Sequence, residues 1–126
     1  MSNYLGTRID DPVLASLAVT GLITESVQDA LTAFAGGGQA SATQITAMNA
    51  RVSTVATAAD SVKLMSAAPG LFLTVINAGA SSMNVFPATG DTINALSANT
   101  ALAVAAGKAC SFICTVAGKW YSLLSA

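Results

Sequence analysis

The chain has 126 residues, of which 53% are apolar and only 9% charged; it has no histidine and a formal net charge of −1. This length fits one domain, or a small domain with an arm. Five scattered cationic residues do not form the basic stripe that phosphate binding needs, so we expect no nucleic acid partner. Without histidine, the commonest general base and most zinc sites are excluded.

The high apolar content raises the question of a membrane segment. The longest apolar tract near the N-terminus, residues 12–23, is shorter than the roughly 20 residues of a spanning helix. Asp10 and Asp11 precede it, where a signal peptide would carry a basic region. We therefore expect a soluble protein with no membrane partner, which covers its apolar surface by self-association.

Residues 1–40 are predicted to form a short helical arm that ends in a glycine-rich linker. Asp11 before Pro12 is a typical helix start, so residues 13–23 are expected to be helical. A second helix is predicted from residue 26, because Val27, Leu31 and Phe34 recur at helical spacing. The glycines at 36–38 end it, and residues 39–44 continue as a flexible linker.

Residues 41–126 are predicted to form a β-domain. Turn signals separate about eight short apolar runs, at a spacing typical of an all-β sandwich or barrel. We therefore expect a mainly β fold, an antiparallel β-sandwich or jelly-roll-like domain that serves in oligomerisation. The runs are residues 51–57, 61–65, 71–77, 83–86, 93–96, 100–106, 110–116 and 119–124, and the last two read as a closing hairpin.

Residues 45–55 leave two alternatives open. Ile45, Met48, Val52 and Val55 fit the heptad spacing of a short three-stranded coiled coil. The many Thr, Ser and Val residues favour a linker followed by a strand.

Two strand predictions concern burial. In residues 71–77 both faces are apolar, which predicts a central strand buried on two sides. Cys110 and Cys114 would lie about 13 Å apart on one strand, too far for a disulfide. We expect two buried free thiols, in keeping with assembly in a reducing cytosol.

The segment from Pro87 to Asn94, PATGDTIN, could be a chemical loop or a turn. Pro87 ends a strand, Gly90 can adopt a positive φ, and Asp91 can bond its own backbone two residues on. A phosphate loop would need a following lysine and helix start, which are missing. A two-carboxylate hydrolase built on Asp60 and Asp91 is conceivable, but no other feature supports it. We predict a turn, and no catalytic, cofactor or metal site.

Residues 61–126 contain a characteristic series of strand and turn residues. They are Val62, Leu64, Val75, Asn77, Gly79, Val85, Pro87, Gly90, Asp91, Ile93, Asn94, Ala106, Gly107, Gly118 and Trp120. In this series the segment resembles a β-module of tailed-bacteriophage head-fibre and capsid decoration (cement) proteins. The family commonly has glycine after its Ile-Asn pair, where this chain has Ala95, so the turn there can differ.

The resemblance implies a virion protein on the capsid exterior, assembled in the host cytoplasm. It implies a homotrimer that binds the major capsid protein, with the second apolar face of residues 71–77 in the trimer interface. The arm would make the capsid contact, with Tyr4, Leu5, Ile9, Leu14, Leu17, Leu22 and Ile23 as candidates.

The alternative is a tail-fibre, baseplate or receptor-binding component. Such a protein would need an exposed aromatic contact. Trp120 and Tyr121 are adjacent and face opposite ways on a strand, and Tyr121 is the candidate for exposure.

Overall fold

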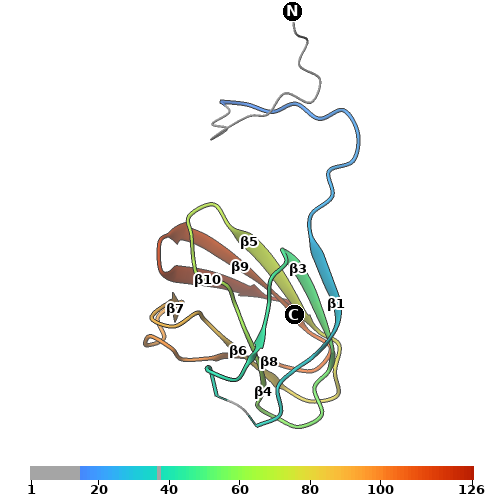
Figure 1. Ribbon diagram of the computed structural model, residues 1–126, viewed down its shortest axis with the longest axis vertical. Helices are drawn as coiled ribbons and strands as arrows, with labels where there is room; N and C mark the ends of the chain where they lie inside the picture. The colour runs from blue at the N-terminus through green and yellow to red at the C-terminus, as the bar shows by residue number, and fades with distance from the viewer. Residues whose placement is uncertain (1–14, 37) are drawn as a thin grey trace, which may run out of the picture.

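The computed structural model describes residues 15–36 and 38–126, which form ten strands in two sheets and contain no helix (Figure 1). Sheet A has the order β1-β3-β5-β9-β10-β7, and sheet B has the order β2-β4-β6-β8. The strands are β1 Val27–Thr32, β2 Thr43–Gln44, β3 Asn49–Thr54, β4 Asp60–Lys63, β5 Phe72–Asn77, β6 Met83–Phe86, β7 Thr92–Ile93, β8 Leu102–Val104, β9 Ala109–Val116 and β10 Lys119–Leu124.

The chain winds between the two sheets as a short solenoid. It alternates from sheet A to sheet B through β1 to β6, and β1, β3 and β5 run parallel, as do β2, β4 and β6. Val27 lies beside Asn49, and Asn49 beside Thr74, so successive coils take 22 and 25 residues. Antiparallel β8, β9 and β10 then complete the two sheets.

The predicted antiparallel sandwich or jelly roll is therefore wrong in its topology, although the mainly β fold is confirmed. Short strands at regular spacing occur in β-sandwiches. They also occur in a solenoid in which consecutive strands belong to alternate sheets. The spacing carries no information on whether neighbours pair parallel or antiparallel.

The predicted N-terminal helices are also wrong where the structure describes them. Residues 15–26 contain no helix, and residues 27–32 form β1, parallel to β3 at the edge of sheet A. The register of β1 shifts around Ala30, whose φ is 56°. Val27 and Phe34, expected on one buried helical stripe, are both exposed, and Ala33 enters the core instead. Residues 13 and 14 of the first predicted helix lie outside the described residues.

The strands after residue 50 overlap the predicted runs, but the run 93–96 shares only Ile93 with β7 and continues as a turn. Residues 49–54 are strand β3, not a coiled coil. Strand β2 lies in the predicted linker. The predicted closing hairpin is confirmed by the antiparallel pair β9–β10. Strand β1 lies within the range that was assigned to the arm, and Ala33 and Phe34 donate backbone hydrogen bonds to Thr54 and Ser61.

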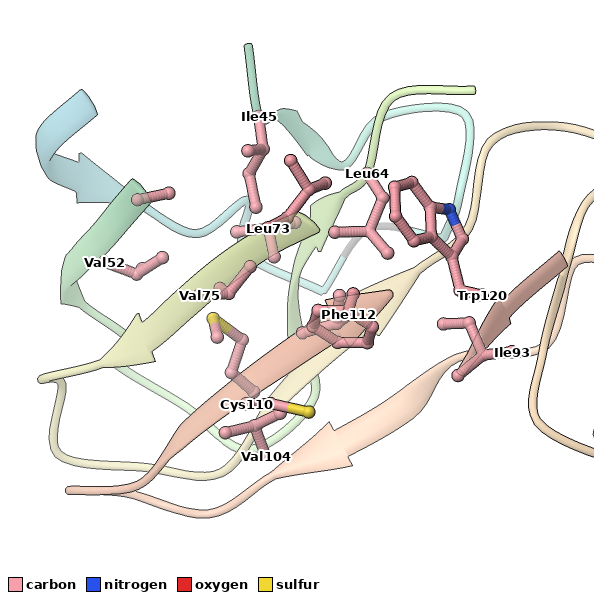
Figure 2. Close-up of a cluster of buried hydrophobic side chains, with 14 of the residues drawn as sticks. Ile45, Val52, Leu64, Leu73, Val75, Ile93, Val104, Cys110, Phe112 and Trp120 are labelled. Atoms are coloured by element: carbon pink, nitrogen blue, oxygen red, sulfur yellow. The ribbon is translucent and has the colours of Figure 1, made fainter. Parts of the chain in front are cut away.

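The core fills the space between the sheets (Figure 2). Trp120 and Phe112 are fully buried and meet edge to face, with ring centroids 6.5 Å apart. At about 25 cal/mol per Å², burial of a large aromatic contributes roughly 4–6 kcal/mol. Cys110 and Cys114 are buried free thiols, as predicted, and burial raises the pKa of Cys110.

A buried amide closes the turn after β5. Asn77 donates from Nδ2 to the carbonyl oxygens of Ser81, at 2.9 Å, and Val104, at 2.8 Å, and Oδ1 accepts from the Gly79 N–H. Gly79 lies so close to the segment after β3 that a Cβ atom at position 79 would stand 2.5 Å from the backbone nitrogen of Val55. Asn77 and Gly79, two residues of the phage-module resemblance, thus have packing roles in this chain.

Strand β5 differs from its prediction on one side. Leu73 and Val75 are fully buried, but Phe72 and Ile76 on the other face are 46% and 37% exposed. The expectation of burial on both sides is wrong for the single chain, because none of the described elements covers the outer face of sheet A.

Candidate functional site

Asp60 is one of the carboxylates considered for catalysis, and its contacts are those of a residue that holds the fold together. It is 1% exposed. It accepts hydrogen bonds from the Thr57 hydroxyl at 2.6 Å and from the backbone N–H groups of Thr57, Ala56 and Gly36. The Thr57 hydroxyl, followed by the Thr57 N–H, lowers the pKa of Asp60 below its ordinary value. Asp60 therefore fixes the turn before β4 to the segment after β1.

Asp91 also holds two segments together. Its Oδ2 accepts from the backbone N–H of Ala67 at 2.8 Å, in place of the predicted bond to its own backbone two residues on. Gly90 has a φ of 90°, as predicted for this turn. Its N–H donates to Oδ1 of Asn99 at 2.7 Å. The first five residues of PATGDTIN, 87–91, are thus a turn tied to Gln39, Ala67 and Asn99, and Thr92 and Ile93 form β7.

The acidic side chains do not gather into one site. Glu25 accepts from Asn49, and Asp29 pairs with Arg51, whose guanidinium lowers the pKa of that carboxyl. Within residues 15–36 and 38–126, no three cysteine or carboxylate side chains lie close enough together to hold a metal ion. In the same residues, no helix has the length and hydropathy that crossing a membrane requires.

The outer face of sheet A is the most distinctive surface of the body. We use this name for the outward side chains of β5, β9 and β10. In register across these strands, Phe72 lies opposite Ile113, and Ile113 lies opposite Tyr121. The three are 46%, 37% and 44% exposed, and together they form a continuous apolar row. The face consists of Phe72, Thr74, Ile76, Ala109, Ser111, Ile113, Tyr121 and Leu123.

The remainder of this face is small or uncharged. Thr74 and Ser111 lie opposite each other with their hydroxyl oxygens 3.5 Å apart, and Leu123 follows on β10. Leu123 is 70% exposed and lines a pocket with Ala109, Ser111, Leu124 and Ser125. A flat, uncharged strip thus extends from the row to the C-terminal end of β10.

Charged groups border the face and are engaged within the chain. Arg51, beside Ile76, pairs with Asp29. The Lys119 ammonium lies 5.0 Å from the ring centroid of Tyr121, a cation–π contact. Lys108 donates to the backbone oxygen of Ala126. These contacts leave the centre of the face uncharged.

The predicted contact residues fall into three groups. Leu17, Leu22 and Ile23 are 74%, 94% and 73% exposed on an extended segment that leaves the sheets (Figure 1). Trp120 is buried and Tyr121 exposed, as their adjacency predicted. The remaining arm candidates, Tyr4, Leu5, Ile9 and Leu14, lie outside the described residues.

Sequence reasoning did not single out Ile113 and Leu123 as surface residues. Their alternation with the buried Phe112 and with Ser122 was visible in the sequence. Their position beside Phe72 and Tyr121 depends on the register of three strands, which alternation does not determine.

No family model, curated protein or solved structure matches this chain.

Proposed function

We propose that this chain is a bacteriophage virion structural protein. It decorates and stabilises the outside of the capsid by binding the major capsid protein as a homotrimer. Its mechanism is binding alone. Each bound copy adds contacts between capsid subunits, and mass action then favours the closed shell over its dissociated parts.

The observation that carries the proposal is the exposed apolar segment before β1. Leu17, Leu22 and Ile23 are largely exposed. The backbone that precedes β1 leads away from the two sheets (Figure 1). Leucine and isoleucine at 94% and 73% exposure make almost no contact with their own chain. Extended apolar segments of this kind gain stability when they add to the surface of another protein.

The phage-module resemblance supports the proposal, because the residues that carry it have structural roles in this fold. Asn77 and Gly79 close one turn, Gly90 and Asp91 another, and Trp120 fills the core. The carboxylates of the described residues are engaged in hydrogen bonds or in the Asp29–Arg51 ion pair, which also favours a binding role over catalysis.

A capsid-binding assay tests the proposal. Purified protein is added to capsids stripped of it, and the bound fraction is measured by sedimentation. Changing Leu22 and Ile23 to aspartate should weaken binding at least about tenfold, since the loss of two apolar contacts exceeds 1.4 kcal/mol. The matched control changes Thr20 and Thr24 to aspartate and should bind nearly as wild type. Equal binding by both double variants would contradict the role given to the segment.

A further inference from the structure

We propose that copies of this chain associate through the outer face of sheet A, with a second copy of the same chain as its occupant. This inference rests on the self-association that the proposed function requires and names the surface through which one copy meets another. Three observations carry it: the continuity of the apolar row, the exposed apolar area, and the lack of charged side chains within the row.

The continuity of the row distinguishes it from ordinary surface apolar residues. Single exposed leucines or valines are normal on any protein. Here Phe72, Ile113 and Tyr121 stand side by side on three hydrogen-bonded strands, so their apolar surfaces join. Sheet faces pack onto each other at about 10 Å, and packing of this kind would cover the row.

The exposed apolar area fits one side of a stable interface. A fully exposed large side chain offers on the order of 150–250 Å². With the exposed fractions of Phe72, Ile76, Ile113, Tyr121 and Leu123, the face presents about 450 Å² of apolar surface. A standard interface buries about 800 Å² per partner, of which a little over half is apolar, or about 450 Å².

The charge pattern favours another copy over a charged partner. Arg51 at the border is paired with Asp29, and Lys119 at the edge lies over the Tyr121 ring and keeps its charge. The row of Phe72, Ile113 and Tyr121 itself offers no charged group to a nucleic acid or an anionic surface. Its chemical match is a second uncharged apolar face, and every copy of this chain carries one. Closed symmetric assembly would cover the face in all copies at once.

The test measures molar mass in solution by gel filtration with light scattering, over a range of protein concentrations. Wild type should have the mass of an oligomer. Ile113→Lys places an ammonium at the centre of the row and should weaken association at least about 100-fold, giving the mass of one chain. Ala103→Lys adds the same charge at an exposed position of β8 in sheet B and should keep the wild-type mass.

Circular dichroism and thermal unfolding establish that each variant is folded. If Ile113→Lys does not fold, the molar mass of Leu123→Lys is measured instead, because Leu123 is 70% exposed and contributes little to the core. A monomeric wild type, or folded Ile113→Lys and Leu123→Lys variants with wild-type mass, would overturn the inference. Wild type that associates through this face but does not bind capsids would refute the proposed function and leave the inference standing.

Discussion

The two faces of sheet A carry similar apolar side chains and meet different surroundings. On the inner face, Leu73, Phe112 and Trp120 have no exposed surface, because they pack in the core between the two sheets (Figure 2). On the outer face, their chain neighbours Phe72, Ile113 and Tyr121 remain 37% to 46% exposed. The difference assigns two roles to one set of strands. The inner residues stabilise the fold, and we propose that the outer residues stabilise the assembly.

The sharpest contrast is between adjacent aromatics on β10. Trp120→Ala should lower the free energy of unfolding by about 3–5 kcal/mol, because it leaves a large cavity beside Phe112. Tyr121→Ala should change the stability of the monomer by less than about 0.5 kcal/mol. Urea unfolding at low protein concentration measures both values. Equal losses for the two variants would remove the distinction between the faces.

The next contrast is between adjacent residues on β5. Leu73→Ala should cost about 2–5 kcal/mol of unfolding free energy, because Leu73 is fully buried. Phe72→Ala should leave the fold nearly as stable and instead raise the dissociation constant of the oligomer. Urea unfolding and sedimentation equilibrium report the two effects separately. An oligomer unaffected by Phe72→Ala would count against the outer face as the interface.

Acid should weaken the fold through Asp60, which begins β4 in sheet B. Hydrogen bonds lower the folded pKa of Asp60, so its contribution to stability is present above the ordinary pKa of about 3.9. That contribution is lost as the pH falls through the folded value. The difference in melting temperature between wild type and Asp60→Asn should therefore be largest near neutral pH and shrink below about pH 4. A constant difference across this range would exclude the carboxylate as the cause.

The smallest expected effect is a gain. Ala59 has a φ of 75°, a left-handed conformation that costs an alanine about 1–2 kcal/mol. Glycine avoids this cost but loses more conformational entropy on folding, so Ala59→Gly should raise unfolding free energy by up to about 1 kcal/mol. Ala58→Gly, without a positive φ, should lower it. Neither change should alter association, because both lie away from the outer face of sheet A.

The local sequence pattern predicted where most strands lie, but it did not predict how they pair. The strands from β3 to β10 were predictable because alternation and turn residues act within a few positions of each other. Parallel pairing was not, because Asn49 and Thr74 become neighbours only through the winding of the whole coil. The helix predicted from Val27 and Leu31 failed because the two residues do not share a buried face. Val27 is exposed, whereas Leu31, after the register shift around Ala30, packs against the core.

The candidate surface was likewise predictable only in part. The opposite orientation of Trp120 and Tyr121 followed from their adjacency on a strand, but adjacency did not determine which of the two is exposed. The apolar row required the pairing of β5 with β9 and of β9 with β10. The second apolar face of β5 was visible in the sequence, but the partners beside it were not.

The copy number of this chain in purified particles tests most directly whether it decorates a capsid. Quantitative mass spectrometry would measure this chain relative to the major capsid protein. We expect a copy number comparable with that of the major capsid protein, which places the chain over the whole shell. Only a few copies per particle would contradict the claim and favour a tail or receptor-binding position, and absence from particles would refute a virion role.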